Sequence, residues 1–156
     1  MKVEFVNPFI QAASEVLEAE LGGTTERGDL RLQKSAFTTD EVTALVGVTG
    51  SVVGMVLYSM SEETARGIVT RMLGQEFEEF DELAQSGIGE LGNVITGRAS
   101  VLLAEAGYPS NITPPALVVG KGTLVTTLDL NRLVFALTTE LGPLEIHVVL
   151  KAAQTD

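Results

Sequence analysis

Three polar residues that are able to bind or orient a reacting group lie within one short stretch of this chain: Ser86, Glu90 and Asn93. On a helix that turns about 100° per residue they fall within roughly 60° of one another and form one narrow stripe. The stripe continues through small residues such as Gly97, and Gly89 lies at its flank. A carboxylate and a carboxamide lie one turn apart on a helix face whose other side chains are small. This arrangement indicates a surface that docks on a partner.

The residue types limit the chemistry that this stripe is able to perform. A carboxamide such as that of Asn93 has both a donor and an acceptor, and these are able to fix the orientation of a water molecule. Ser86 has no His or Lys at a fixed spacing to activate its hydroxyl, so a serine nucleophile is not predicted. Glu and Asn three residues apart are also common on a merely solvated helix face, and this alternative stays open at this point.

Apolar periodicity places the stripe on the longest helix of the chain, which is predicted to run from near Asp81 to Gly107. The arc opposite the stripe is expected to face the core and contains Leu83, Ile88, Leu91, Val94, Ile95, Ala99 and Leu102. Arg98 projects into that arc. Each glycine in a helix costs up to about 1 kcal/mol relative to Ala. Several in one helix therefore indicate a requirement for close approach.

The remaining pattern predicts two further helices and a set of strands. The first helix is expected to open at Asn7-Pro8 and to stop at Gly22-Gly23, and the second to run from a Ser61 cap to Gly74. Strands are expected at 29–37, 41–49, 51–58, 117–130, 132–140 and 144–150. Because hairpin connections dominate, we predict an α+β fold. Its sheet is antiparallel-rich, its long helices pack on one face, and its halves are pseudo-symmetric.

Composition bounds the class of protein. The 156 residues fit a single domain, 1–156, and 45% of them are hydrophobic, which predicts a packed core. A formal charge of −11 argues against nucleic acid or an anionic membrane as the partner. There is no cysteine and no apolar run of membrane-spanning length, so we expect a soluble, cytoplasmic protein.

Here the motif points to a family. Ser86-x3-Glu90-x2-Asn93 followed by Pro114-Pro115 resembles the signature of the CheC/CheX/FliY phosphatases, which is an Asp or Ser, then Glu, Asn and a later Pro. A single motif in a chain of this length is similar to the CheX type. The two prolines lie slightly closer to Asn93 than the family pattern places its proline.

The resemblance implies an activity and a role for each residue. These phosphatases hydrolyse the phospho-aspartate of CheY-type chemotaxis response regulators. On this basis Glu90 and Asn93 are the expected catalytic residues, with Asn93 orienting the attacking water and Glu90 pairing with a lysine of the regulator. The expected partner contacts are Ser86, Gly89, Gly97, Pro114 and Pro115. The chain is expected to need no metal or cofactor of its own, because Mg²⁺ would sit in the acidic cluster of the regulator.

Two readings of a different class compete with catalysis. One is a non-catalytic dimeric binding module for a response regulator or a flagellar-type partner, and the other is a dimeric scaffold joined through strand edges. The resemblance also implies a homodimer joined through its sheets, and we expect it to bury strand residues in the runs 124–128 and 133–137. His147, the only histidine, is expected at the surface or at an interface.

Overall fold

The computed structural model describes residues 2–33, 36–127 and 130–154, which form three helices and ten strands. The helices are α1 (Val3–Leu21), α2 (Glu62–Leu73) and α3 (Glu82–Glu105). The strands are β1 (Glu26–Arg27), β2 (Arg31–Gln33), β3 (Ala36–Thr38), β4 (Val42–Gly50), β5 (Val52–Met60), β6 (Ser110–Ile112), β7 (Ala116–Val119), β8 (Leu124–Thr126), β9 (Arg132–Thr139) and β10 (Gly142–Ala152).

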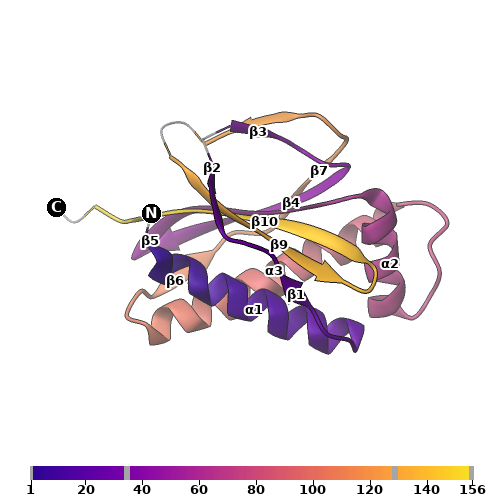
Figure 1. Cartoon of the computed structure of the whole chain (residues 1–156), viewed down its shortest axis with the longest axis horizontal. Helices are drawn as coiled ribbons and strands as arrows, with labels where there is room; N and C mark the ends of the chain where they lie inside the picture. The colour runs from indigo at the N-terminus through magenta and orange to yellow at the C-terminus, as the bar shows by residue number, and fades with distance from the viewer. Residues whose placement is uncertain (1, 34–35, 128–129, 155–156) are drawn as a thin grey trace.

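One large antiparallel sheet organises the molecule. Its strand order is β1-β9-β10-β5-β4-β6, with β2 also paired to β9 and β7 also paired to β4. Figure 1 shows α1, α2 and α3 on the same side of this sheet, and β3 on the other side. β3 pairs with β8 in a separate two-stranded sheet. The predicted α+β class, with an antiparallel sheet and the helices on one face, is confirmed.

The core lies between the helices and the large sheet, because alternate side chains of the central strands point toward the helices. The inward-facing residues of β4, β5 and β10 are buried, among them Val46, Val56 and Val148, which lie opposite one another in the register. The strand predicted at 41–49 is observed as β4. On the helix side, Phe9 and Leu17 of α1 are fully buried.

Capping residues set the ends of α2 and the start of α3 as predicted. Ser61 caps α2 by accepting a hydrogen bond from the Thr64 N–H at 3.1 Å, and Gly74 ends that helix in the left-handed conformation. Asp81 caps α3 in the same way, by accepting from the Ala84 N–H at 2.9 Å.

The start of α1 differs from the prediction. The helix begins at Val3, and Pro8 lies inside it. The missing N–H of Pro8 leaves the Glu4 carbonyl without its helical partner. Burial of Phe5 and Val6 against the core outweighs this local cost, so the Asn7-Pro8 start signal is overridden.

Two predicted long strands are broken into shorter ones. The 29–37 segment gives β2 and β3, and the 117–130 segment gives β7 and β8; within them, residues 34–35 and 128–129 lie outside the described residues. Between β7 and β8 the chain turns at Gly120 and Gly122, whose φ angles are +142° and +84°. A turn of this kind ends the strand pairing that alternation alone would have continued.

A second buried cluster lies on the outer face of the sheet, where β3 packs on β9 and β10. Arg132 is 1% exposed, and its Nε donates to His147 Nδ1 at 3.0 Å. Because Nδ1 accepts, Nε2 of His147 carries the proton and donates to Glu145 at 2.8 Å. The Phe37 ring stacks on the His147 ring at 4.3 Å and lies 4.5 Å from the Arg132 guanidinium. His147 is therefore buried within the chain, and the prediction of a position at the surface or at an interface is wrong.

This cluster predicts an acid dependence of stability. The hydrogen bond from His147, together with Arg31, holds the pKa of Glu145 below its ordinary value of 4.5. A carboxylate with a lowered pKa stabilises the fold above its unfolded-state pKa, and this contribution disappears as the pH falls through the folded-state value. We expect the difference in free energy of unfolding between the wild type and Glu145→Gln to shrink as the pH falls through and below 4.5, measured by urea denaturation. A difference that stays constant or grows would contradict this assignment.

Candidate functional site

The predicted motif lies on the outward side of α3. Ser86 and Glu90 are exposed and Asn93 is half-buried. Among the residues that the structure describes, none of these three side chains has a hydrogen-bond or ion-pair partner. Their polar groups are therefore free to meet a ligand or a partner protein.

A close contact with the sheet fixes the height and rotation of this helix beside Asn93. A Cβ on Gly92 would lie 3.4 Å from both the Ala44 Cβ and the Tyr58 ring, so the helix backbone lies directly on the sheet there. Thr96 donates to the Gly92 carbonyl at 2.7 Å, and the Tyr58 hydroxyl donates to Thr96 at 2.7 Å. Burial raises the pKa of Tyr58, which keeps that hydroxyl protonated.

The other glycines of α3 have different surroundings. A Cβ on Gly87 would lie 2.8 Å from Val69 of α2, so this glycine serves helix packing. A Cβ on Gly89 would lie 3.3 Å from Leu117, so this glycine admits the chain segment that leads into β7. At Gly97 a Cβ would meet only a carbon of Ile112, at 3.8 Å, and this position is not required for packing.

An open groove of about 570 Å³ runs between the first half of α3 and β7. Its lining residues are Glu82, Gln85, Ser86, Gly89, Glu90, Pro115 and Leu117. Of the predicted site residues, the groove brings together Ser86, Gly89, Glu90 and Pro115. Asn93 lies one turn further along α3, Gly97 lies beside Ile112, and Pro114 is exposed and not among the lining residues.

Two positions of the predicted inward arc face solvent. Leu83 and Val94 are 50% and 37% exposed, and Val101, also on α3, is 48% exposed. At about 100° per residue, these three residues lie within about 40° of Glu90 around the helix axis. The polar stripe therefore has an apolar border. Arg98 points out of the core and pairs with Glu15 of α1 at 3.1 Å, so its place in the apolar arc needs no buried partner.

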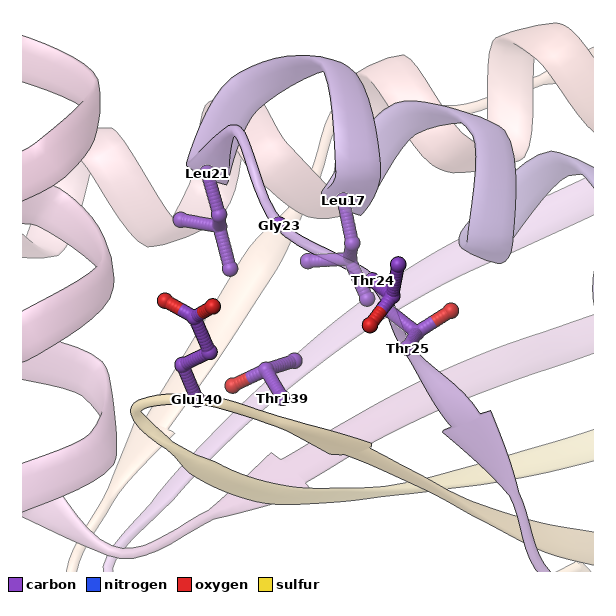
Figure 2. Close-up of a pocket in the computed structure, with 7 residues that line it drawn as sticks. All are labelled: Leu17, Leu21, Gly23, Thr24, Thr25, Thr139 and Glu140. Carbon is purple, nitrogen blue, oxygen red and sulfur yellow. The ribbon is translucent and has the colours of Figure 1, made fainter.

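A second, small pocket lies at the end of α1 (Figure 2). It is about 10 Å³ in volume, enough for a single water molecule, and Leu17, Leu21 and Thr139 are among its lining residues. Arg71 of α2 joins the same corner, because it donates to the Leu21 carbonyl at 2.8 Å and pairs with Glu140 at 3.5 Å. These contacts connect α1, α2 and the turn between β9 and β10.

Within the described ranges, no group of three or more His, Asp or Glu side chains is arranged to hold a metal ion. In the same part of the chain, none of the helices has the length and apolarity needed to cross a membrane.

Sequence reasoning missed the residues that support the motif rather than belong to it. Tyr58 and Thr96 position α3, and Leu117 borders the groove. One signal was present: Tyr58 is an aromatic hydroxyl on an otherwise apolar strand face, and such a group needs a buried partner. Its partner Thr96 is the one hydroxyl residue on the core side of α3. Leu117 carries no comparable signal.

The fold defines the class of protein. A CheC-like superfamily protein from Shewanella sp. PV-4 superposes with a TM-score of 0.87 at 27% sequence identity, covering 97% of this chain and 100% of that one. CheX of Borrelia burgdorferi, in a crystal structure of its complex with CheY, BeF3 and Mg²⁺, gives a TM-score of 0.76 at 25% identity over 96% of this chain and 99% of that one. The chain thus has the CheC-like fold.

Sequence comparison narrows the class to one family. The family model described as chemotaxis phosphatase CheX matches residues 42–138. The CheY-P phosphatase CheX of Thermotoga maritima is 34% identical over 122 residues, which is 78% of this chain and 79% of that protein. This chain belongs to the CheX family of chemotaxis phosphatases.

The different surroundings of the α3 glycines predict opposite effects of the same substitution. Gly87→Ala forces a Cβ into buried Val69, an overpacking cost of about 1–3 kcal/mol that exceeds the helix-propensity gain of about 1 kcal/mol. Gly97→Ala meets no close neighbour and keeps the gain. We expect urea denaturation to show Gly87→Ala less stable than the wild type by about 1 kcal/mol and Gly97→Ala more stable by up to about 1 kcal/mol. Equal shifts in the same direction would contradict the packing described.

Proposed function

We propose that this chain is a phosphatase that hydrolyses the phospho-aspartate of a CheY-type response regulator. One observation carries the proposal: Glu90 and Asn93 lie unpaired, one turn apart, on the exposed face of α3 in a member of the CheX family. The named activity of the Thermotoga maritima relative and the Borrelia burgdorferi complex with CheY support the choice of substrate. We propose that residues 1–156 act as one domain, in the cytoplasm, where such regulators act.

The proposed chemistry needs little from this chain beyond positioning. Water attacks the phosphorus, the bond between phosphorus and the aspartyl oxygen breaks, and the carboxylate and inorganic phosphate leave. The barrier falls when the water is held in line with that bond. Asn93 supplies an acceptor for one water hydrogen and a donor to its surroundings, and a carboxamide does so without a change of protonation. The Mg²⁺ belongs to the regulator that serves as substrate.

Glu90 is proposed to set the docking geometry. It is exposed and unpaired, so it is able to meet a regulator lysine without losing an interaction of its own. We propose that Ser86, Gly89 and Gly97 are further partner contacts of the same helix. Of the two prolines, we propose that Pro115 contacts the partner, because Pro115 lines the groove beside Glu90.

A non-catalytic docking module is the second candidate. It is favoured by the exposed apolar border of Leu83, Val94 and Val101, a surface suited to a protein partner whether or not chemistry follows. The two functions are distinguished by measuring the rate of phosphate release from a panel of phosphorylated regulators of the same organism, with and without this protein. Catalysis predicts faster release for at least one regulator. A docking module predicts that the protein binds a regulator without accelerating the release of phosphate.

Asn93 is predicted to be required for turnover but not for docking. Asn93→Ala should lower the rate of phosphate release by at least about a hundredfold, the scale of losing a positioned water, while affinity for a beryllofluoride-bound regulator is kept. Glu90→Lys should weaken that affinity through like-charge contact with the regulator lysine. The matched control is Asn131→Ala, an exposed asparagine at the start of β9. Near-normal release by Asn93→Ala would overturn the mechanism.

We also propose that the protein is a C₂ homodimer. The expected interface requires correction, because 133–137 is buried within the chain's own sheet except for Ala136. Leu124 on β8, which begins the other expected run, is 66% exposed, and Leu32 on β2 is 65% exposed, so both are available to a second copy. Light scattering at micromolar concentration is expected to give twice the chain mass of 16.5 kDa, and Leu124→Asp should shift the mass toward the single chain. A mass of 16.5 kDa for the wild type would exclude the dimer.

A further inference from the structure

The short connection between β6 and β7 is fixed to β4 at one residue. β6 pairs with β4 up to Ile112 opposite Val48, and β7 resumes the pairing with Ala116 opposite Leu45. Three connecting residues, 113–115, therefore face only two residues of β4, as in a bulge. Two of the three are prolines, which have no N–H to give to the neighbouring strand.

Thr113 makes the contacts that hold this connection. Its N–H donates to the Gly47 carbonyl at 2.9 Å, and its Oγ1 accepts from the Gly47 N–H at 2.8 Å. The same hydroxyl donates to the Pro114 carbonyl at 3.3 Å. One threonine thus satisfies both backbone groups of Gly47 and braces the next residue of its own loop.

Gly47 is the residue that this arrangement requires on β4. A Cβ built there would lie 2.9 Å from Thr113 Oγ1 and 3.0 Å from its Cγ2, closer than side chains tolerate. The φ of Gly47 is not positive, so its backbone conformation is open to other residues. The space taken by Thr113, and not the local backbone, therefore favours glycine at this position.

The anchored loop ends at the wall of the candidate site. Pro115 and Leu117 contact the helix at Gly89, one residue before Glu90: a Cβ on Gly89 would lie 3.6 Å from Pro115 and 3.3 Å from Leu117. Both residues line the groove with Ser86 and Glu90. A shift of the loop relative to β4 would therefore change the width of the groove in which a partner docks.

From these contacts we propose that Thr113 is a positioning residue for docking. Through its two hydrogen bonds to Gly47 it fixes Pro115 as the wall of the groove beside Ser86 and Glu90, and so sets the affinity for the phosphorylated regulator. The inference rests on the proposed function. It assigns Thr113 no contact with the reacting atoms, so its loss should act on substrate binding and leave the chemical step in place.

The test compares Thr113→Val with Thr113→Ser. Valine keeps the shape and removes the hydroxyl, whereas serine keeps the hydroxyl. With a phosphorylated regulator that the wild type hydrolyses, we expect Thr113→Val to raise KM about tenfold and to leave kcat within about twofold. Affinity for the beryllofluoride-bound regulator should fall to the same extent. Thr113→Ser should have the KM and the affinity of the wild type.

Two further variants separate positioning from general damage. Gly47→Ala removes the space for Thr113 and should raise KM as Thr113→Val does. The double variant Gly47→Ala/Thr113→Val should show no additional effect, because both changes break the same contact. Thr138→Val is the matched control, an exposed strand threonine on β9 toward the opposite edge of the sheet. Its KM should equal that of the wild type.

The outcomes distinguish this proposal from the function on which it rests. If the wild type accelerates no regulator, the proposed phosphatase function fails. If the wild type is active and Thr113→Val has an unchanged KM, or if Thr113→Ser behaves as valine does, the positioning role of Thr113 is overturned while the phosphatase function stands. A fall in kcat alone would also overturn it, since that result would place Thr113 in the chemical step.

Discussion

The close seating of α3 on the sheet at Gly92 is the constraint on which the rest of the structure depends. The helix backbone rests on Ala44 and Tyr58 because no side chain intervenes, and the hydrogen-bonded pair of Tyr58 and Thr96 fixes the rotation of the helix at the same place. A helix held this closely has little freedom to roll. The polar stripe therefore points away from the sheet at a defined angle, with Asn93 directly beside the point of contact.

This seating explains why α3 tolerates so many glycines. Gly92 allows contact with the sheet, Gly87 allows contact with α2, and Gly89 allows contact with the chain that leads into β7. Each of these contacts holds one side of the helix, and together they leave one side uncovered. Gly97 lies on that uncovered side, where its lack of a side chain serves no contact within the chain. The propensity cost of these residues is thus offset by packing in three cases, whereas Gly97 has no such close contact.

The two faces of the large sheet are stabilised by different means. The helix side is an apolar core, whereas the outer side under β3 holds the buried Arg132, its hydrogen bond to His147 and the stacked ring of Phe37. A buried guanidinium costs free energy unless it is paired, and here a histidine, a backbone carbonyl and an aromatic face meet it. The small β3–β8 sheet is held through this cluster, away from the groove beside α3.

The sequence by itself determined the features that depend on neighbours along the chain. Helix periodicity placed Ser86, Glu90 and Asn93 on one face, the caps at Ser61 and Asp81 set two helix starts, and the strand-forming residues at 41–49 predicted β4. Each of these signals acts within a few residues. Only the tertiary structure decided that Pro115 and not Pro114 borders the groove and that His147 is buried. Those outcomes depend on which distant segment covers each position: Arg132 binds the carbonyl of Ala36, 96 residues away. No local pattern records a contact between residues that far apart, because it forms only when the sheet assembles.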